Sequence, residues 1–114
     1  MVTIYHNPRC SKSRQTLALL EERGIEPKII PYLDTPPSAG TLKTVLKKLG
    51  MTPRQILRKG EDVYKTLNLN NEKLTDTQLI EAMAANPILI ERPIVVNGDK
   101  AALGRPPEQV LAIL

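Results

Sequence analysis

The chain has little of several residue types that often decide a protein's class. It has a single cysteine, no tryptophan, no phenylalanine and only three tyrosines in 114 residues. One cysteine cannot form an internal disulfide, a Cys-x-x-Cys redox pair or a cysteine-rich zinc cluster. With so few aromatic rings the core must be aliphatic, and a stacking platform for single-stranded nucleic acid is missing. We therefore expect no metal site and no nucleic-acid partner.

Long apolar runs are also missing. None approaches the ~18 residues that a membrane-spanning helix needs, so we expect no membrane association. The opening residues, Met1–His6, have neither the basic head nor the apolar stretch of a secretory signal, which favours a cytoplasmic, reducing compartment. Hydrophobic residues make up 41% and charged residues 25%, as in ordinary globular proteins. The length of 114 residues indicates one domain.

Positive charge gathers in the front half of the chain. Residues 1–57 hold 9 basic and 4 acidic side chains, whereas residues 58–114 hold 7 and 8, and the net charge is +4. Such an excess fits either a merely soluble surface or a basic site for an anionic ligand. Composition leaves both interpretations open.

The opening of the chain predicts a βαβ unit. Val2–Tyr5 alternates β-branched and polar residues and predicts a short strand. After a loop, Ser11 or Ser13 is placed to cap a helix that stops at Gly24. Lys28–Leu33 then predicts a second strand, and a helical connection of this size favours parallel pairing of the two strands.

The remainder predicts a helical stretch and then a hairpin followed by a last helix, which gives the order β-α-β, helices, β-β-α. Asn97-Gly98-Asp99 is a strong hairpin signal between Ile94–Val96 and Lys100–Leu103, and Pro106-Pro107 opens the last helix. Start and stop signals place the middle helices at Ser38 to Gly50, Thr52-Pro53 to Gly60, Glu61 to Leu67, and from the Thr75/Gln78 capping box to Asn86-Pro87.

Cys10 lies where the first strand meets the first helix. Around it, Arg9, Lys12 and Arg14 supply positive charge, and His6 to Arg14 contains no acid. Nearby cations and the N–H groups of a helix N-terminus both favour the thiolate over the thiol. The alternative is a buried structural cysteine, but the basic loop before a helix favours a reactive one.

The same position predicts an anion site, because the backbone N–H groups of Ser11, Lys12 and Ser13 begin the helix. A tyrosine-phosphatase loop needs an arginine six positions after its cysteine, and Thr16 stands there. A two-thiol thioredoxin motif fails as well, because Ser13 replaces its second cysteine. The motif is Cys-x-x-Ser, which allows a monothiol centre.

Three arginines elsewhere are candidates for binding an oxyanion: Arg58, Arg92 and Arg105. Guanidinium groups hold tetrahedral oxyanions through paired hydrogen bonds, so a converging set would suit arsenate, phosphate or sulfate. Taken singly, each also fits an ordinary surface arginine. His6, the only histidine, precedes Cys10 by four residues and is placed to hydrogen-bond the loop or to influence the ionisation of the thiol.

Four segments in order resemble the arsenate reductases of the ArsC family, which use glutathione and glutaredoxin. The resemblance covers essentially the whole chain. It implies an α/β, thioredoxin-like (glutaredoxin-like) fold with a mixed sheet, formed by one domain over 1–114 with a helical insertion at about 38–85. The segments are Tyr5–Arg14 (YHNPRCSKSR), Leu57-Arg58, Glu91–Val96 (ERPIVV) and Gly104–Pro106.

The resemblance also implies a mechanism. Cys10 attacks arsenate, and the oxyanion is held by the three arginines together with the helix N-terminus. Glutathione is the co-substrate, glutaredoxin resolves the resulting mixed disulfide, and no bound cofactor is implied. The residues expected to support the site without binding substrate are His6, Arg14 and Pro93, the last of these matching a cis proline of the family.

Two alternatives come from other functional classes. A monothiol glutaredoxin-like oxidoreductase would use Cys10 and Pro93 but would leave Arg58 and Arg105 without a role. A Spx-like regulator of the same fold would bind RNA polymerase without catalysis, but that group usually carries a Cys-x-x-Cys switch. Arg9, directly before Cys10, is a bulky cation at the lip of the site; it fits contact with glutathione, attraction of a different anion, or exposure to solvent.

Overall fold

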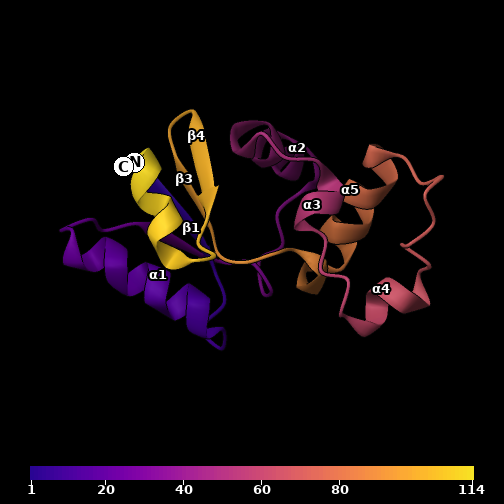
Figure 1. Ribbon diagram of the computed structural model, residues 1–114, viewed down its shortest axis with the longest axis horizontal. Helices are drawn as coiled ribbons and strands as arrows, with labels where there is room; N and C mark the ends of the chain where they lie inside the picture. The colour runs from indigo at the N-terminus through magenta and orange to yellow at the C-terminus, as the bar shows by residue number, and fades with distance from the viewer. The chain divides into compact units, whose positions relative to one another are not determined.

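The computed structural model describes all residues, 1–114, and the chain divides into two compact units. The sheet unit comprises Met1–Thr35 and Arg92–Leu114, and the helical unit comprises Pro36–Glu91 (Figure 1). The helical unit corresponds to the expected insertion with slightly wider bounds. That the two form one domain stays a prediction. None of the helices is long and apolar enough to cross a membrane.

All four strands belong to the sheet unit, in the order β2-β1-β3-β4. The first pair, β1 and β2, is parallel, as the βαβ pattern predicted, and the two other pairings are antiparallel. Ile4 in the central strand therefore lies opposite Ile29 on one side and Val95 on the other. The strands are β1 Val2–His6, β2 Lys28–Pro31, β3 Ile94–Asn97 and β4 Lys100–Leu103.

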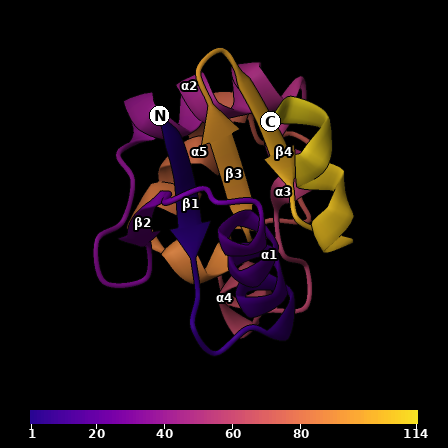
Figure 2. The ribbon, with the colours of Figure 1, turned by 90° about the vertical axis from the view of Figure 1, so that its left-hand side faces the viewer.

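Two helices, α1 (Ser11–Glu22) and η2 (Pro107–Ile113), cover one face of this sheet (Figure 2). Between them and the sheet lies an aliphatic core in which every member is fully buried: Ile4, Leu20, Val95 and Val110. The expected last helix is present, but it is a 3₁₀ helix and not an α-helix. Its hydrogen bonds join residues three apart, as from the Gln109 N–H to the Pro106 carbonyl at 3.1 Å, which is the spacing of a 3₁₀ helix.

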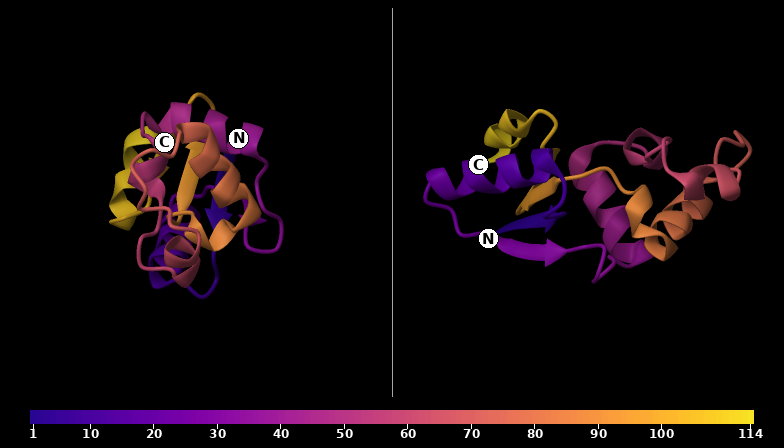
Figure 3. Two further views of the ribbon diagram at one scale, coloured as in Figure 1. Left: turned by 90° about the vertical axis from the view of Figure 1, so that its right-hand side faces the viewer. Right: turned by 90° about the horizontal axis from the view of Figure 1, so that it is seen from below.

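The helical unit is built from α2 and α5, with shorter helices around them (Figure 3). Ser38 Oγ accepts from the Thr41 N–H at 3.1 Å, and the Thr75/Gln78 capping box is formed, so both predicted helix starts are confirmed. The core of this unit is aliphatic, with Leu42, Leu79 and Met83 almost fully buried. The helices are α2 Ala39–Leu49, α3 Pro53–Ile56, α4 Asp62–Thr66, α5 Asp76–Ala85 and η1 Pro87–Leu89.

Helix α3 is shorter than the sequence predicted, ending at Ile56 and not near Gly60. Leu57 takes an extended backbone and forms a β-bridge with Ile90. On either side of this bridge, the Arg58 N–H donates to the Leu89 carbonyl and the Glu91 N–H donates to the Ile56 carbonyl, both at 2.8 Å. These long-range bonds compete successfully with continuation of the helix, and they place Arg58 and Glu91 on neighbouring backbone segments.

Candidate active site

Cys10 itself is the N-cap residue of α1, which corrects the expectation that Ser11 or Ser13 caps the helix. Its backbone is extended, with φ −93° and ψ 123°. The Cys10 N–H donates to the Asn7 carbonyl at 3.0 Å, and the Arg14 N–H donates to the Cys10 carbonyl at 3.0 Å to begin the helix. A tight turn therefore leads straight into the first helical turn, which puts the cysteine at the positive end of the helix dipole.

The pKa of the Cys10 thiol lies below its ordinary value of 9.0. Partial burial alone would raise this pKa, but groups around the sulfur more than offset burial. The Ser13 N–H and the Lys12 N–H stabilise the thiolate, and the Arg92 guanidinium does so through both a hydrogen bond and its charge. The expected thiolate-favouring environment is therefore present, although its arginine comes from far along the sequence and not from Arg9 or Arg14.

A buried polar network holds the loop beneath Cys10. Ser13 Oγ lies 2.6 Å from His6 Nδ1, and it accepts the Asn7 N–H at 3.0 Å. All three residues are buried, and Ser13 is fully so. Burial, followed by the positive charge of Arg14, lowers the pKa of His6 below 6.5, which keeps the imidazole neutral at neutral pH. His6 therefore supports the loop, one of the two roles expected for it.

Arg14, another expected supporting residue, fixes the outer part of the loop. Its guanidinium donates from Nη1 to the Pro8 carbonyl at 2.9 Å. The neighbouring Arg9 N–H donates to Asn7 Oδ1 at 3.0 Å. These two hydrogen bonds fix the backbone of the turn before Cys10 at Pro8 and at Arg9. The Arg9 side chain itself is exposed.

Arg92 and Pro93 lie where three segments of the sheet unit come close together: the start of β3, the residues after β4, and helix α1. The Arg92–Pro93 peptide bond is cis, as the resemblance implied, and the Arg105–Pro106 bond is also cis. The Gly104 N–H donates to the Pro93 carbonyl at 2.9 Å. A Cβ at Gly104 would collide with Thr16 Oγ1 and would lie 2.7 Å from Pro93 Cγ. Glycine is therefore required there to bring Pro93 and α1 together.

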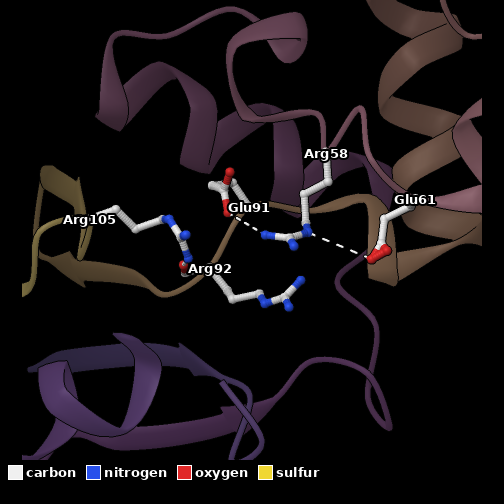
Figure 4. A network of polar contacts seen from close by, with 5 residues as sticks. All are labelled: Arg58, Glu61, Glu91, Arg92 and Arg105. Carbon is white, nitrogen blue, oxygen red and sulfur yellow. Dashed lines mark hydrogen bonds and ion pairs between the residues drawn. The ribbon is translucent and has the colours of Figure 1, made fainter. Parts of the chain in front are cut away.

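Arg105 lies beside Arg92 in the sheet unit. Its guanidinium donates from Nη1 to the Arg92 carbonyl at 3.2 Å (Figure 4), and the residue is exposed. Arg58 belongs to the helical unit, where Glu91 Oε1 accepts from its Nη1 at 2.7 Å and Glu61 lies 3.9 Å from its Nε (Figure 4). The side chains of Arg58 and Glu91 are each 24% exposed, so this pair is partly protected from solvent.

Three predicted site residues lie around the Cys10 sulfur in the sheet unit. Lys12 and Ser13 contribute their backbone N–H groups, and Arg92 contributes its guanidinium. Ser11 stands exposed at the first position of α1. The sequence interpretation missed the acidic partners of Arg58. It also missed the contact of Gly104 with the fully buried Thr16, whose hydroxyl donates to the Lys12 carbonyl at 2.8 Å. Gly104 was within a segment of the resemblance, but nothing in the sequence indicated its neighbours.

The fold and this site define a class. A four-stranded mixed sheet carries a thiolate-stabilised cysteine at the start of its first helix, and a cis proline opens the third strand. This is the arrangement of thioredoxin-like proteins, as expected from the sequence, and comparisons with known proteins give the family within that class.

The sequence model of the ArsC family matches residues 5–113, and the chain belongs to this family. The uncharacterized protein YfgD of Escherichia coli (strain K12) is 58% identical over 99% of this chain and 96% of its own length. An arsenate reductase of Haemophilus influenzae is 54% identical over 99% of this chain and 98% of its own. The solved structure of an arsenate reductase from Vibrio cholerae matches with a TM-score of 0.97 at 56% identity, covering 99% of this chain and 97% of the other.

Proposed function

We propose that this protein is an arsenate reductase in which Cys10 is the nucleophile and glutathione and glutaredoxin supply the electrons. The observation that carries the proposal is the stabilised Cys10 thiolate, which faces two helix N–H groups and the Arg92 guanidinium. Those groups suit a tetrahedral oxyanion as well as a thiolate, so nucleophile and anion site coincide. Relatives at 50–54% identity over nearly the whole chain are named arsenate reductase, which supports the same reaction.

The first step is a substitution at arsenic. The Cys10 thiolate forms a sulfur–arsenic bond, and an arsenate oxygen leaves as hydroxide or, after protonation, as water. Arg92, with the N–H groups of Lys12 and Ser13, is positioned to neutralise the negative charge that this step concentrates on the arsenate oxygens.

The second step reduces arsenic. A glutathione thiolate attacks the Cys10 sulfur, a disulfide bond forms, and the sulfur–arsenic bond breaks with its electron pair remaining on arsenic. Arsenic(V) thereby becomes arsenic(III), and the two sulfurs together are oxidised by two electrons. Because the chain has no second cysteine, an external thiol must reopen the mixed disulfide. In our proposal this thiol is glutaredoxin, and no bound metal or organic cofactor takes part.

Arg58 and Arg105 are proposed to bind the oxyanion with Arg92, as the family resemblance implies. They also separate this function from its main alternative. A monothiol glutaredoxin-like exchanger needs Cys10 but has no use for a set of arginines. Arg58→Ala and Arg105→Ala are therefore expected to lower arsenate turnover strongly and to leave exchange with a glutathionylated peptide unchanged. Equal loss in both assays, or no loss in either, would count against the reductase.

The direct test is arsenite formation with arsenate, glutathione, glutaredoxin and NADPH-linked glutathione reductase. The native chain should turn over, and Cys10→Ser should lose turnover completely while remaining folded by circular dichroism. Glu26→Gln, a change at an exposed residue outside the site, is the control and should match the native chain. A folded native protein that forms no arsenite under these conditions would refute the proposal.

A further inference from the structure

A cavity of about 280 Å³ lies beside the Cys10 loop and has no part in the chemistry described above. The buried His6 and Asn7 line it from the end of β1, and Pro31, Leu33 and Asp34 line it from the end of β2. Because β1 and β2 are parallel, their carboxyl ends meet at one edge of the sheet. Ligands of open α/β sheets bind outside the carboxyl ends of the strands, so the cavity is in a favourable place for a ligand.

Two opposite charges line this cavity. Arg9 and Asp34 are both exposed, and neither forms an ion pair with the other or with any residue of the chain. Opposite charges that share a cavity without pairing leave both groups available to a ligand. A ligand that satisfies both must itself carry an anionic and a cationic group.

The backbone beneath each charge is fixed by hydrogen bonds. Arg9 N–H donates to Asn7 Oδ1 at 3.0 Å, in the same turn in which the Cys10 N–H donates to the Asn7 carbonyl. On the other side, the N–H groups of Asp34 and Thr35 both donate to the Pro31 carbonyl at 2.9 Å. Only the side chains of Arg9 and Asp34 need to be ordered when a ligand binds, which limits the entropic cost of binding.

We propose that this cavity binds the α-amino-acid end of the peptide thiol that attacks Cys10, namely the γ-glutamyl group of glutathione. Its carboxylate pairs with the Arg9 guanidinium, and its ammonium group pairs with the Asp34 carboxylate. Arg9 is the residue directly before Cys10, so a peptide anchored there has its thiol near the nucleophile. The proposal rests on the proposed function, because it assigns a place to the glutathione of that reaction.

The size and the charges of the cavity both favour this ligand. Pockets that enclose a drug-sized molecule measure ~300–1,000 Å³. The cavity measures about 280 Å³, close to the lower end of that range, so it has room for a γ-glutamyl group. Arsenate is the poorer occupant, since it has no cationic group for Asp34 and its negative charge is repelled by that carboxylate.

The test is a titration of the full-length Cys10→Ser chain with S-methylglutathione, followed by NMR. Neither partner has a reactive thiol, so the signals report binding alone. Shifts are expected to cluster at His6–Arg9 and Pro31–Asp34. In that background, Arg9→Gln and Asp34→Asn should each weaken binding by about three- to tenfold, the range for single charge-assisted contacts. The matched controls, Arg23→Gln and Glu26→Gln, remove exposed charges elsewhere and should bind like the parent.

A second ligand separates the two contacts. N-acetyl-S-methylglutathione keeps its carboxylates and lacks the ammonium group, so the parent chain should bind it less tightly. Asp34→Asn should lose nothing further with this ligand, whereas Arg9→Gln should still lose affinity. Equal binding of the two ligands by the parent chain would overturn the assignment, as would the absence of binding or shifts that cluster elsewhere.

Kinetics distinguish failure of this site from failure of the proposed function. In the chain with native Cys10, Arg9→Gln and Asp34→Asn should raise KM for glutathione while KM for arsenate stays constant. A chain without arsenate turnover that shows the expected titration pattern would keep the site and refute the reaction. Turnover with unchanged KM for glutathione in both variants would keep the reaction and refute the site.

Discussion

The sheet unit and the helical unit bury different kinds of side chain. The structure has four buried polar or charged residues, and all of them lie in the sheet unit. In the helical unit, every residue of that class is at least partly exposed, and burial is confined to apolar side chains. The four are His6, Asn7, Ser13 and Thr16.

The difference follows from what each unit has to hold. An aliphatic core stabilises a protein through burial, which has no directional requirement. A thiolate needs donors at fixed positions, and these in turn need hydrogen-bonded support from behind. Ser13 meets both needs, because its N–H faces the Cys10 sulfur while its buried hydroxyl lies between His6 and the Asn7 N–H. Variants in the two units should therefore separate stability from thiol chemistry.

The largest loss of stability is expected in the helical unit, for Met83→Ala. Met83 is fully buried, and truncation of such a side chain costs about 2–5 kcal/mol through lost burial and the cavity left behind. Urea unfolding should show this loss, and the pH midpoint of Cys10 alkylation should stay where it is. Leu67→Ala, at a residue 45% exposed in the same unit, is the control and should change stability little.

A smaller loss, now with a change at the thiol, is expected for Gly104→Ala. The added methyl group collides with Thr16 and Pro93, and such overpacking costs about 1–3 kcal/mol. Displacement of Pro93 moves the neighbouring Arg92 from the sulfur, so the alkylation midpoint should rise. Full stability with an unchanged midpoint would show that this approach has no influence on the site.

Ser13→Ala should cost about 1–2 kcal/mol, because it leaves the Asn7 N–H and the His6 ring without their buried partner. The thiol pKa should rise less than in an Arg92 variant, since the Ser13 backbone N–H is retained. Thermal unfolding and alkylation kinetics measure the two effects. Ser11→Ala, a change at an exposed serine of the same helix, should be neutral for stability; a loss as large as that of Ser13→Ala would mean that the network carries no special weight.

Local signals in the sequence predicted most of the fold. The helix start at Thr52-Pro53, the capping box at Thr75, the glycine stop at Gly50 and the hairpin at Asn97-Gly98 depend on neighbouring residues, and the structure confirms each. The end of α3 was predicted wrongly because a long-range pairing, Leu57 with Ile90, decides it. Antiparallel pairing of β1 with β3 likewise joins segments that no local pattern connects.

The candidate site also has features that neighbouring residues predict and features that depend on long-range contacts. The loop before α1 predicted a reactive Cys10, and the structure shows a lowered thiol pKa. The local sequence predicted that the charges of Arg9, Lys12 and Arg14 stabilise the thiolate. In the structure the stabilising charge is that of Arg92, 82 residues further along the chain. The partners of Arg58 were hidden for a related reason, since Glu91 approaches it only through the ladder beside the Leu57 bridge. Roles in binding substrate stay predictions for Arg58 and Arg105.

The ionisation of Cys10 also links the site to stability. A thiol whose pKa is lowered by folding adds stability that is fully present above the unfolded pKa and is lost as pH falls through the folded pKa. Unfolding free energy should therefore increase with pH across that window in the native chain. The corresponding increase should be absent from Cys10→Ser.

The most direct measurement is the rate of Cys10 alkylation by iodoacetamide against pH, in the native chain and in Arg92→Gln. Only the thiolate reacts, so the midpoint of the rate profile reports the thiol pKa. Our account predicts a midpoint below 9.0 in the native chain and a higher one in Arg92→Gln, because a guanidinium that stabilises the thiolate has been removed. A native midpoint no lower than that of an unperturbed cysteine thiol, or the same midpoint in both chains, would contradict the account.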